Sequence, residues 1–145
     1  MSQTDPALLA RLTERAATNT FWRTMGVEAV DAWEGYAKLR VPVRDDLRNA
    51  DGAPVHGGVL AFLVDAAIGG ALGSLHDHAG GGVGQATLDL NITYLGAVRD
   101  GAMVAEGRIL RRGGSVAFGE TEVRDEAGAL LAKGRATYLI LRPRS

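Results

Sequence analysis

The chain has 145 residues, 16 basic and 17 acidic side chains, a net charge of −1 and no cysteine. A chain of this length fits one domain, which we place at residues 1–145. The balanced charge gives no general electrostatic footprint for nucleic acid or an acidic membrane, and the lack of cysteine excludes disulfides and thiolate zinc sites. Because residues 1–20 lack the apolar stretch of a secretory signal, we expect a cytoplasmic protein.

The chain begins with a pattern that predicts a short amphipathic helix. Pro6 suits a helix start, and apolar residues at helical spacing follow it until about Asn19. We therefore expect residues 1–24 to form a helical flap over the rest of the domain.

A hairpin and a loop are predicted next. Two strand-like runs, at about Met25–Trp33 and Tyr36–Val43, are joined by a tight turn at Glu34-Gly35. The polar segment Arg44–Val55 contains glycine and proline and predicts a loop.

A single charged side chain, Asp65, lies within the apolar run Val59–Leu75. The run is shorter than the ~20 apolar residues of a membrane span, so we expect a buried core helix. A carboxylate there loses water at a cost in free energy, which makes Asp65 a candidate functional group. The structural alternative is that Asp65 caps a neighbouring segment or pairs with an arginine from a strand.

The sequence His56-Gly57-Gly58 precedes this run and predicts the start of the same helix. Free backbone N–H groups and the helix dipole favour negative charge at such a position, so Gly57 is a candidate donor to an oxyanion. Gly57 and Asp65 are eight residues apart, which is about 12 Å along a helix axis. If both act on one carbonyl group, they must come from two copies of the helix in a dimer.

The rest of the chain predicts a glycine-rich connector at residues 76–84 and then four strands. The strands are expected near Gln85–Leu95, Met103–Arg111, Val116–Arg124 and Leu130–Leu141. Short turns between them favour antiparallel pairing, and one long helix would cover one face of the sheet. The order therefore predicts an α+β fold.

The first of these four strands alternates apolar and polar residues. The expected core face carries Leu88, Leu90, Ile92 and Tyr94. The expected opposite face, for solvent, a site or a subunit contact, carries Thr87, Asp89, Asn91 and Thr93.

Four segments together resemble one family. The segments are "HGGVLAFLVD", "TLDLNITYLGAV", "RRGGSVAFGETEV" and "GALLAKGRATYLI". Over about Gly26–Ile140 the chain is similar to the phenylacetate-degradation type of hotdog-fold acyl-CoA thioesterases. The resemblance implies a six-stranded antiparallel sheet wrapped around one long central helix, with a short N-terminal helix. It also implies a homo-oligomer, commonly a dimer of dimers, that hydrolyses acyl-CoA to free acid and coenzyme A. No separate cofactor is expected, since coenzyme A is part of the substrate.

The resemblance also assigns roles to residues around the reacting thioester. The Gly57 N–H would hold the thioester oxygen, and Asp65 of the partner subunit would act as general base or nucleophile. Thr87 would position the water, and His56 would orient the helix start or contact the thioester. The family asparagine corresponds to Asn49, which lies one residue farther from the histidine than is usual.

Coenzyme A would be bound by Gly58 and by the turn containing Arg111, Arg112 and Gly113, because arginine binds phosphate with two hydrogen bonds.

Two alternative functions stay open: a non-hydrolytic acyl-CoA binding or regulatory protein, and a hydratase of enoyl or 3-hydroxyacyl thioesters. We expect no metal site, because His76-Asp77-His78 has the pattern of a solvated loop.

Overall fold

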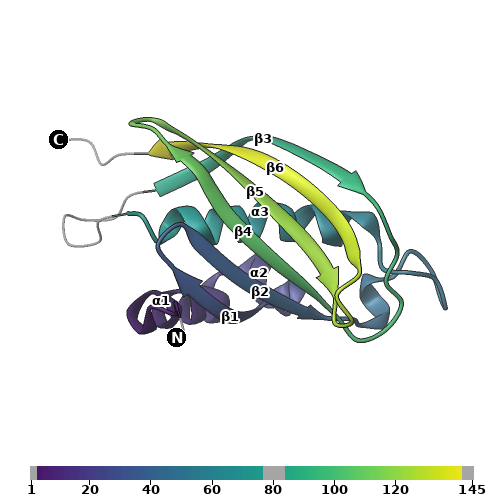
Figure 1. The fold of residues 1–145 in the computed structure, drawn as a ribbon. Coiled ribbons are helices and arrows are strands. Elements are labelled where there is room, and N and C mark those ends of the chain that lie inside the picture. Colours follow the sequence, from purple (N-terminus) through teal and green to yellow (C-terminus); the bar gives the residue numbers. More distant parts are fainter. Residues whose placement is uncertain (1–2, 77–83, 142–145) are drawn as a thin grey trace.

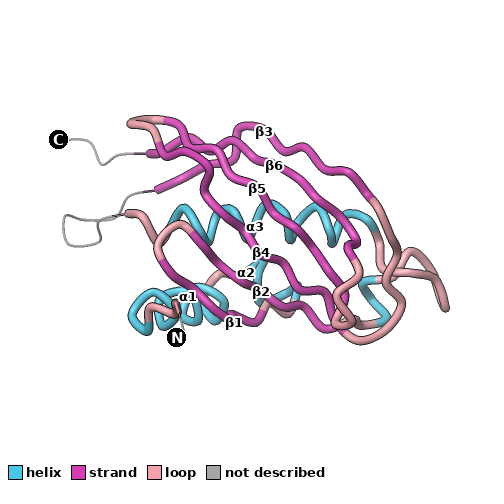
Figure 2. The backbone as a smooth tube through the Cα atoms, in the orientation of Figure 1, coloured by secondary structure: helices cyan, strands magenta, loops and turns pink. Residues whose placement is uncertain are grey.

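The computed structural model describes residues 3–76 and 84–141. A six-stranded, wholly antiparallel sheet in the order β1-β2-β4-β5-β6-β3 lies in front of one long helix (Figures 1 and 2). In chain order the elements are α1 (Pro6–Thr18), α2 (Thr20–Met25), β1 (Glu28–Trp33), β2 (Tyr36–Pro42), a 3-10 turn (Asp45–Leu47), α3 (Gly57–Gly73), β3 (Gly84–Tyr94), β4 (Ala102–Arg112), β5 (Val116–Asp125) and β6 (Leu130–Leu141). This architecture is the hotdog arrangement that the family resemblance implies.

The N-terminal segment forms two helices rather than one. Asp5 caps α1 by accepting hydrogen bonds from the N–H groups of residues 7 and 8, and Leu8 and Leu12 are buried in the core. The side chain of Asn19 then caps α2 by accepting from the Trp22 N–H at 3.0 Å. The prediction of a strand from Met25 is wrong in its first residues, because Gly26 ends α2 in a left-handed conformation and β1 begins at Glu28.

The sheet fixes the position of α3 closely. A Cβ atom on Gly107 of β4 would lie 2.4 Å from the carbonyl group of Ala67, so only glycine allows the strand to approach the helix this far. On β5 the buried Thr121 hydroxyl donates to the carbonyl oxygen of Val64 at 2.9 Å. The less buried residues of the first half of α3 recur at spacings of three and four and form one stripe: Gly57, Gly58, Ala61, Phe62 and Asp65.

Strand β3 lies at an edge of the sheet and contains a bulge. Its pairing with β6 shifts between Thr87 and Asp89, so that Leu88 is an extra residue. The predicted sharing of one face by Thr87 and the polar residues after it is therefore wrong: Thr87 reaches α3, whereas Asp89 and Asn91 line a groove on the outer face.

The predicted core face of β3 also needs correction. Ile92 packs against the core, but Leu88, Leu90 and Tyr94 are 57%, 37% and 52% exposed. An edge strand has a neighbour on one side only, which leaves its apolar side chains partly uncovered.

Two expectations from the sequence concern segments that lie largely outside the described residues. One is the glycine-rich connector at residues 76–84, and the other is the solvated loop at His76-Asp77-His78. Residues 77–83 are not described. Within the described ranges, no helix has both the length and the apolar character needed to cross a bilayer.

Candidate active site

Asp65 is half-buried on α3, and two hydroxyl groups hold the same oxygen of its carboxylate. The Thr87 Oγ1 donates to Asp65 Oδ1 at 2.9 Å, and the Tyr138 hydroxyl donates to Oδ1 at 2.6 Å. Thr87 and Tyr138 are direct partners across the β3–β6 pair, so the sheet presents both donors at one point. Among residues 3–76 and 84–141, no group bonds to Oδ2 and no cation forms an ion pair with the carboxylate.

Tyr138 is a site residue that the sequence reasoning did not find. Its side chain is 5% exposed, and its hydroxyl also lies 2.8 Å from the carbonyl oxygen of Asp65. Burial first, and then the hydrogen bond with Asp65, raise the pKa of Tyr138 above its ordinary value. The hydroxyl is therefore a protonated donor over the neutral pH range. To find Tyr138 beforehand, one would have to know that the last strand pairs with β3 and places Tyr138 opposite Thr87. A single sequence does not specify that pairing.

A row of polar groups continues from Asp65 along α3. The carbonyl oxygen of Gly69 accepts hydrogen bonds from Gln85 Nε2 at 2.8 Å and from Arg15 Nη1 at 3.1 Å. Gln85 Oε1 in turn lies 2.8 Å from His76 Nε2. Burial lowers the pKa of Arg15, and electrostatic interactions with Tyr138 and Asp65 oppose that change. The nearby cation of α1 thus bonds to the helix backbone and not to the carboxylate.

The start of α3 lies where the sequence places it. His56 is the N-cap, and its Nδ1 accepts from the Gly58 N–H at 2.8 Å. The Tyr94 hydroxyl donates to the carbonyl oxygen of Gly57 at 2.9 Å. The Gly57 N–H has no acceptor in the part of the chain that the structure describes, so it is available to an oxyanion.

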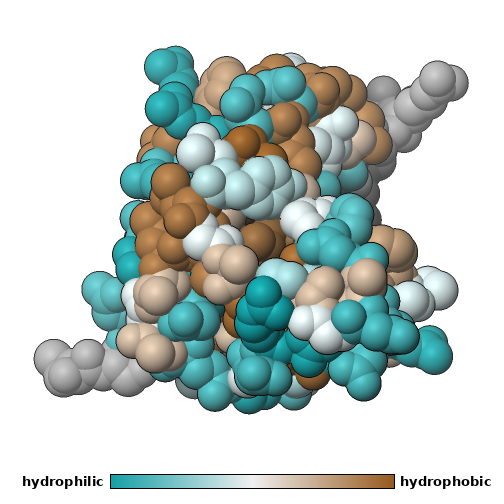
Figure 3. Space-filling view, turned by 90° about the vertical axis from the view of Figure 1, so that its right-hand side faces the viewer, coloured by the Kyte–Doolittle hydropathy of each residue, from teal (hydrophilic) through white to brown (hydrophobic). Residues whose placement is uncertain are grey.

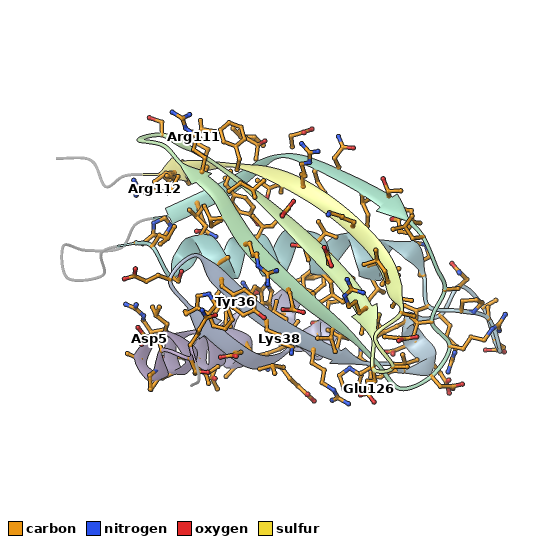
Figure 4. All side chains as sticks on the ribbon, viewed as in Figure 1. Asp5, Tyr36, Lys38, Arg111, Arg112 and Glu126 are labelled. Atoms are coloured by element: carbon orange, nitrogen blue, oxygen red, sulfur yellow. The ribbon has the colours of Figure 1, made fainter. Side chains whose placement is uncertain are left out.

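Among the described residues, Asn49, Arg111 and Arg112 form no hydrogen bond with Asp65, His56 or Gly57. Asn49 is exposed, and its backbone and side-chain N–H groups both donate to the carbonyl oxygen of Pro54, within its own loop. Arg111 and Arg112 are exposed at the β4–β5 turn, at the end of the sheet away from the start of α3 (Figure 4). Arg112 Nη1 donates to the carbonyl oxygen of Gly113 at 3.2 Å. Within one protomer, Thr87 lies at Asp65 and His56 lies at the start of α3. Asn49 bonds within the loop that leads into α3, and the β4–β5 turn lies at the other end of the sheet.

The described residues contain no group of three or more histidine or acidic side chains placed to hold a metal ion. The chemistry available at this site is that of a carboxylate, hydroxyl groups and a free backbone amide.

Comparison with known proteins supplies the family. Residues 54–132, more than half of the chain, match the sequence pattern of the Thioesterase superfamily. The chain belongs to the thioesterase superfamily. A Halobacterium salinarum protein, provisionally named an esterase, is 34% identical to it over 127 residues, which cover 81% of this chain and 82% of the relative.

Solved structures agree with this membership. Zebra fish thioesterase superfamily member 2 is 28% identical, with a TM-score of 0.77, over 95% of this chain and 99% of that protein. The Escherichia coli PaaI protein of the phenylacetic acid degradation operon, at 18% identity, shows the same fold with a TM-score of 0.80 over 97% of each chain. The family and these relatives support hydrolysis of a thioester as the general activity of this superfamily member.

Proposed function

We propose that this chain hydrolyses acyl-CoA thioesters to a free acid and coenzyme A. Asp65 acts as general base or nucleophile, and the Gly57 N–H of the other protomer in a dimer holds the thioester oxygen. The observation that carries the proposal is the asymmetric carboxylate of Asp65: two hydroxyl groups hold Oδ1, and Oδ2 has no donor within the described residues. An oxygen left in this state can take a proton from water or attack a carbonyl carbon.

The chemistry suits a thioester. In the general-base form, Asp65 takes a proton from water, and the water oxygen bonds to the carbonyl carbon. The negative charge that develops on the carbonyl oxygen is held by the Gly57 N–H at the positive end of α3. When the C–S bond breaks, coenzyme A leaves as a thiolate, which needs little help from a general acid. No separate cofactor takes part.

The spacing along α3 supports a dimer if Gly57 and Asp65 act on the same carbonyl group. Gly57 and Asp65 are separated by about 12 Å of helix, too far to serve one carbonyl group within a protomer. The edge strand β3 carries exposed Leu88 and Leu90, which a second copy would cover. Hydrophobic residues also reach the surface beside hydrophilic ones at the end of the molecule where α3 begins (Figure 3). We propose that β3 edges join two protomers and that dimers pair into a tetramer.

The two parts of the substrate would contact different side chains. Gly58, Arg111, Arg112 and Gly113 would bind coenzyme A, with the guanidinium groups on its phosphates. The acyl group would lie near the exposed Phe21, whose ring packs edge-on against Phe62 with centroids 5.1 Å apart. Phe62 precedes Asp65 by one helical turn, so an acyl group beside it would lie next to the carboxylate.

The test is a thiol-release assay over a panel of aryl and alkyl acyl-CoAs, comparing the wild type with Asp65→Asn. We expect turnover to fall at least about 100-fold, because the amide cannot act as base or nucleophile, while coenzyme A binding and folding are retained. Asp89→Asn, on the outer face of β3, is the matched control and keeps wild-type turnover.

Equal turnover by the Asp65→Asn variant would remove Asp65 from the mechanism. Tight acyl-CoA binding without thiol release by the wild type would instead support the non-hydrolytic binding protein. A change in enoyl absorbance without thiol release would support the hydratase.

A further inference from the structure

We propose that Tyr138 is a positioning residue for Asp65: together with Thr87 it holds Oδ1 and so directs Oδ2 toward the reacting group. This inference rests on the proposed thioesterase function and adds a residue to it. The distances that carry it are 2.6 Å from the Tyr138 hydroxyl and 2.9 Å from the Thr87 hydroxyl to the same carboxylate oxygen.

The need for such a residue follows from the freedom of an aspartate side chain. The torsion that decides which carboxylate oxygen points outward has broad, roughly two-fold preferences, so the fixed backbone of α3 does not set it. Two donors that converge on one oxygen from neighbouring strands do set it. Thr87 and Tyr138 are paired across β3 and β6, so their separation is fixed by the sheet and not by flexible side chains.

Tyr138 is suited to this task by reach and by charge state. Its hydroxyl comes so close to α3 that a Cβ atom on Gly69 would lie 2.8 Å from it, which means that the helix has a gap where the hydroxyl lies. Its raised pKa, caused first by burial, keeps the group a donor. A hydrogen bond to a charged acceptor is stronger than one to a neutral acceptor, so the proton goes to the carboxylate in preference to the Asp65 carbonyl oxygen.

A purely structural role would make different predictions. If Tyr138 only tied β6 to α3, its loss would lower stability without affecting kcat of the folded enzyme. If it acts through Asp65, its loss lowers kcat, leaves KM nearly unchanged and has no further effect once the carboxylate is gone.

The experiment replaces Tyr138 by phenylalanine, which removes the hydroxyl and keeps the ring. We expect kcat for thiol release to fall roughly 10- to 100-fold, the range of a hydrogen bond to a charged group, with KM within about two-fold of the wild type. The matched control is Tyr36→Phe. Tyr36 is 3% exposed and donates to Glu106 Oε2 at 2.5 Å from the neighbouring pair β2–β4, so it undergoes the same chemical change away from Asp65. The control keeps wild-type kcat and KM.

A double-mutant cycle separates the two interpretations. In the Asp65→Asn background, adding Tyr138→Phe is expected to change kcat by less than about two-fold. If Tyr138→Phe does not fold, as judged by circular dichroism, Gly69→Ala replaces it, because the new Cβ atom displaces the hydroxyl and leaves the tyrosine in place. Gly69→Ala is expected to show the same loss in kcat.

Wild-type kcat in Tyr138→Phe, an equal loss with and without Asp65, or a loss confined to KM would overturn the inference. These results differ from a failure of the proposed function. That failure would appear as no thiol release by the wild type, or as full activity in Asp65→Asn.

Discussion

Gly107→Ala is expected to disturb both the stability of the protein and the geometry of its site. The new Cβ atom would lie 2.4 Å from the carbonyl carbon and oxygen of Ala67, whereas ordinary contacts begin at 3.4 Å, so strand and helix must separate by about 1 Å. Backbone atoms cannot rotate away as a flexible side chain can. Overpacking of this kind costs about 1–3 kcal/mol, which for a domain of this size lowers Tm by roughly 3–10 °C.

The same displacement acts on the site, because Ala67 follows Asp65 by two residues on α3. A shift of about 1 Å in a reacting group can reduce turnover by about 100-fold. We expect thermal unfolding followed by circular dichroism to show the lower Tm, and thiol release at a temperature well below it to show the lower kcat.

Gly73→Ala is the control for this substitution. A Cβ atom at Gly73 would make an ordinary contact, 3.5 Å from the Arg15 guanidinium, and alanine favours a helix more than glycine does. This variant keeps wild-type kcat and has an unchanged or slightly higher Tm. If Gly107→Ala matched it in both measurements, close approach of β4 would not be what positions α3.

Three further outcomes are expected. Thr87→Val lowers kcat for thiol release about ten-fold by removing one donor to Asp65, whereas Thr93→Val, on the outer face of the same strand, has no effect. Leu90→Lys places a charge on the β3 edge, so we expect the protein to sediment at the monomer mass and to lose thiol-release activity. A dimer that persists in sedimentation velocity would exclude this edge as the contact between protomers. Burial raises the pKa values of Tyr36 and Tyr138 in the folded chain, so the free energy of unfolding is fully retained below pH 10 and falls as the pH rises further. The expected fall is about 1.4 kcal/mol per pH unit for each tyrosine. Urea unfolding at pH 9 and pH 11 measures the fall, and each Tyr→Phe variant is expected to reduce it.

Much of the fold was predictable because its signals are local. Apolar runs of the right length, punctuated by glycine, place the long helix and all six strands to within a few residues, and Leu130–Leu141 has the predicted bounds. The helix α2 was missed because Asn19, which ends α1, also caps a second short helix. A capped helix of only six residues is too short to show a helical repeat of apolar residues in the sequence.

The bulge in β3 shows where local patterns fail. Strict alternation places Thr87 and Asp89 on one face, but the inserted Leu88 separates them, and the insertion exists only in relation to β6. The partnership of Thr87 with Tyr138 depends on the same register. The family resemblance pointed to Thr87 at the site of Asp65, but the approach of the Tyr138 hydroxyl to the same oxygen could not be predicted, because it depends on this register.

The way Asp65 is held favours the functional interpretation of a lone acid in an apolar helix over the structural one. A structural aspartate would be expected to cap a neighbouring segment or to form an ion pair, which would occupy its oxygens and compensate its charge. Arg15 is close enough to influence the local charge, yet its guanidinium bonds to the carbonyl oxygen of Gly69. Neutral hydroxyl donors hold one carboxylate oxygen without compensating its charge. An arrangement that orients the carboxylate and leaves its other oxygen unbonded within the described residues retains the property that a base or nucleophile needs.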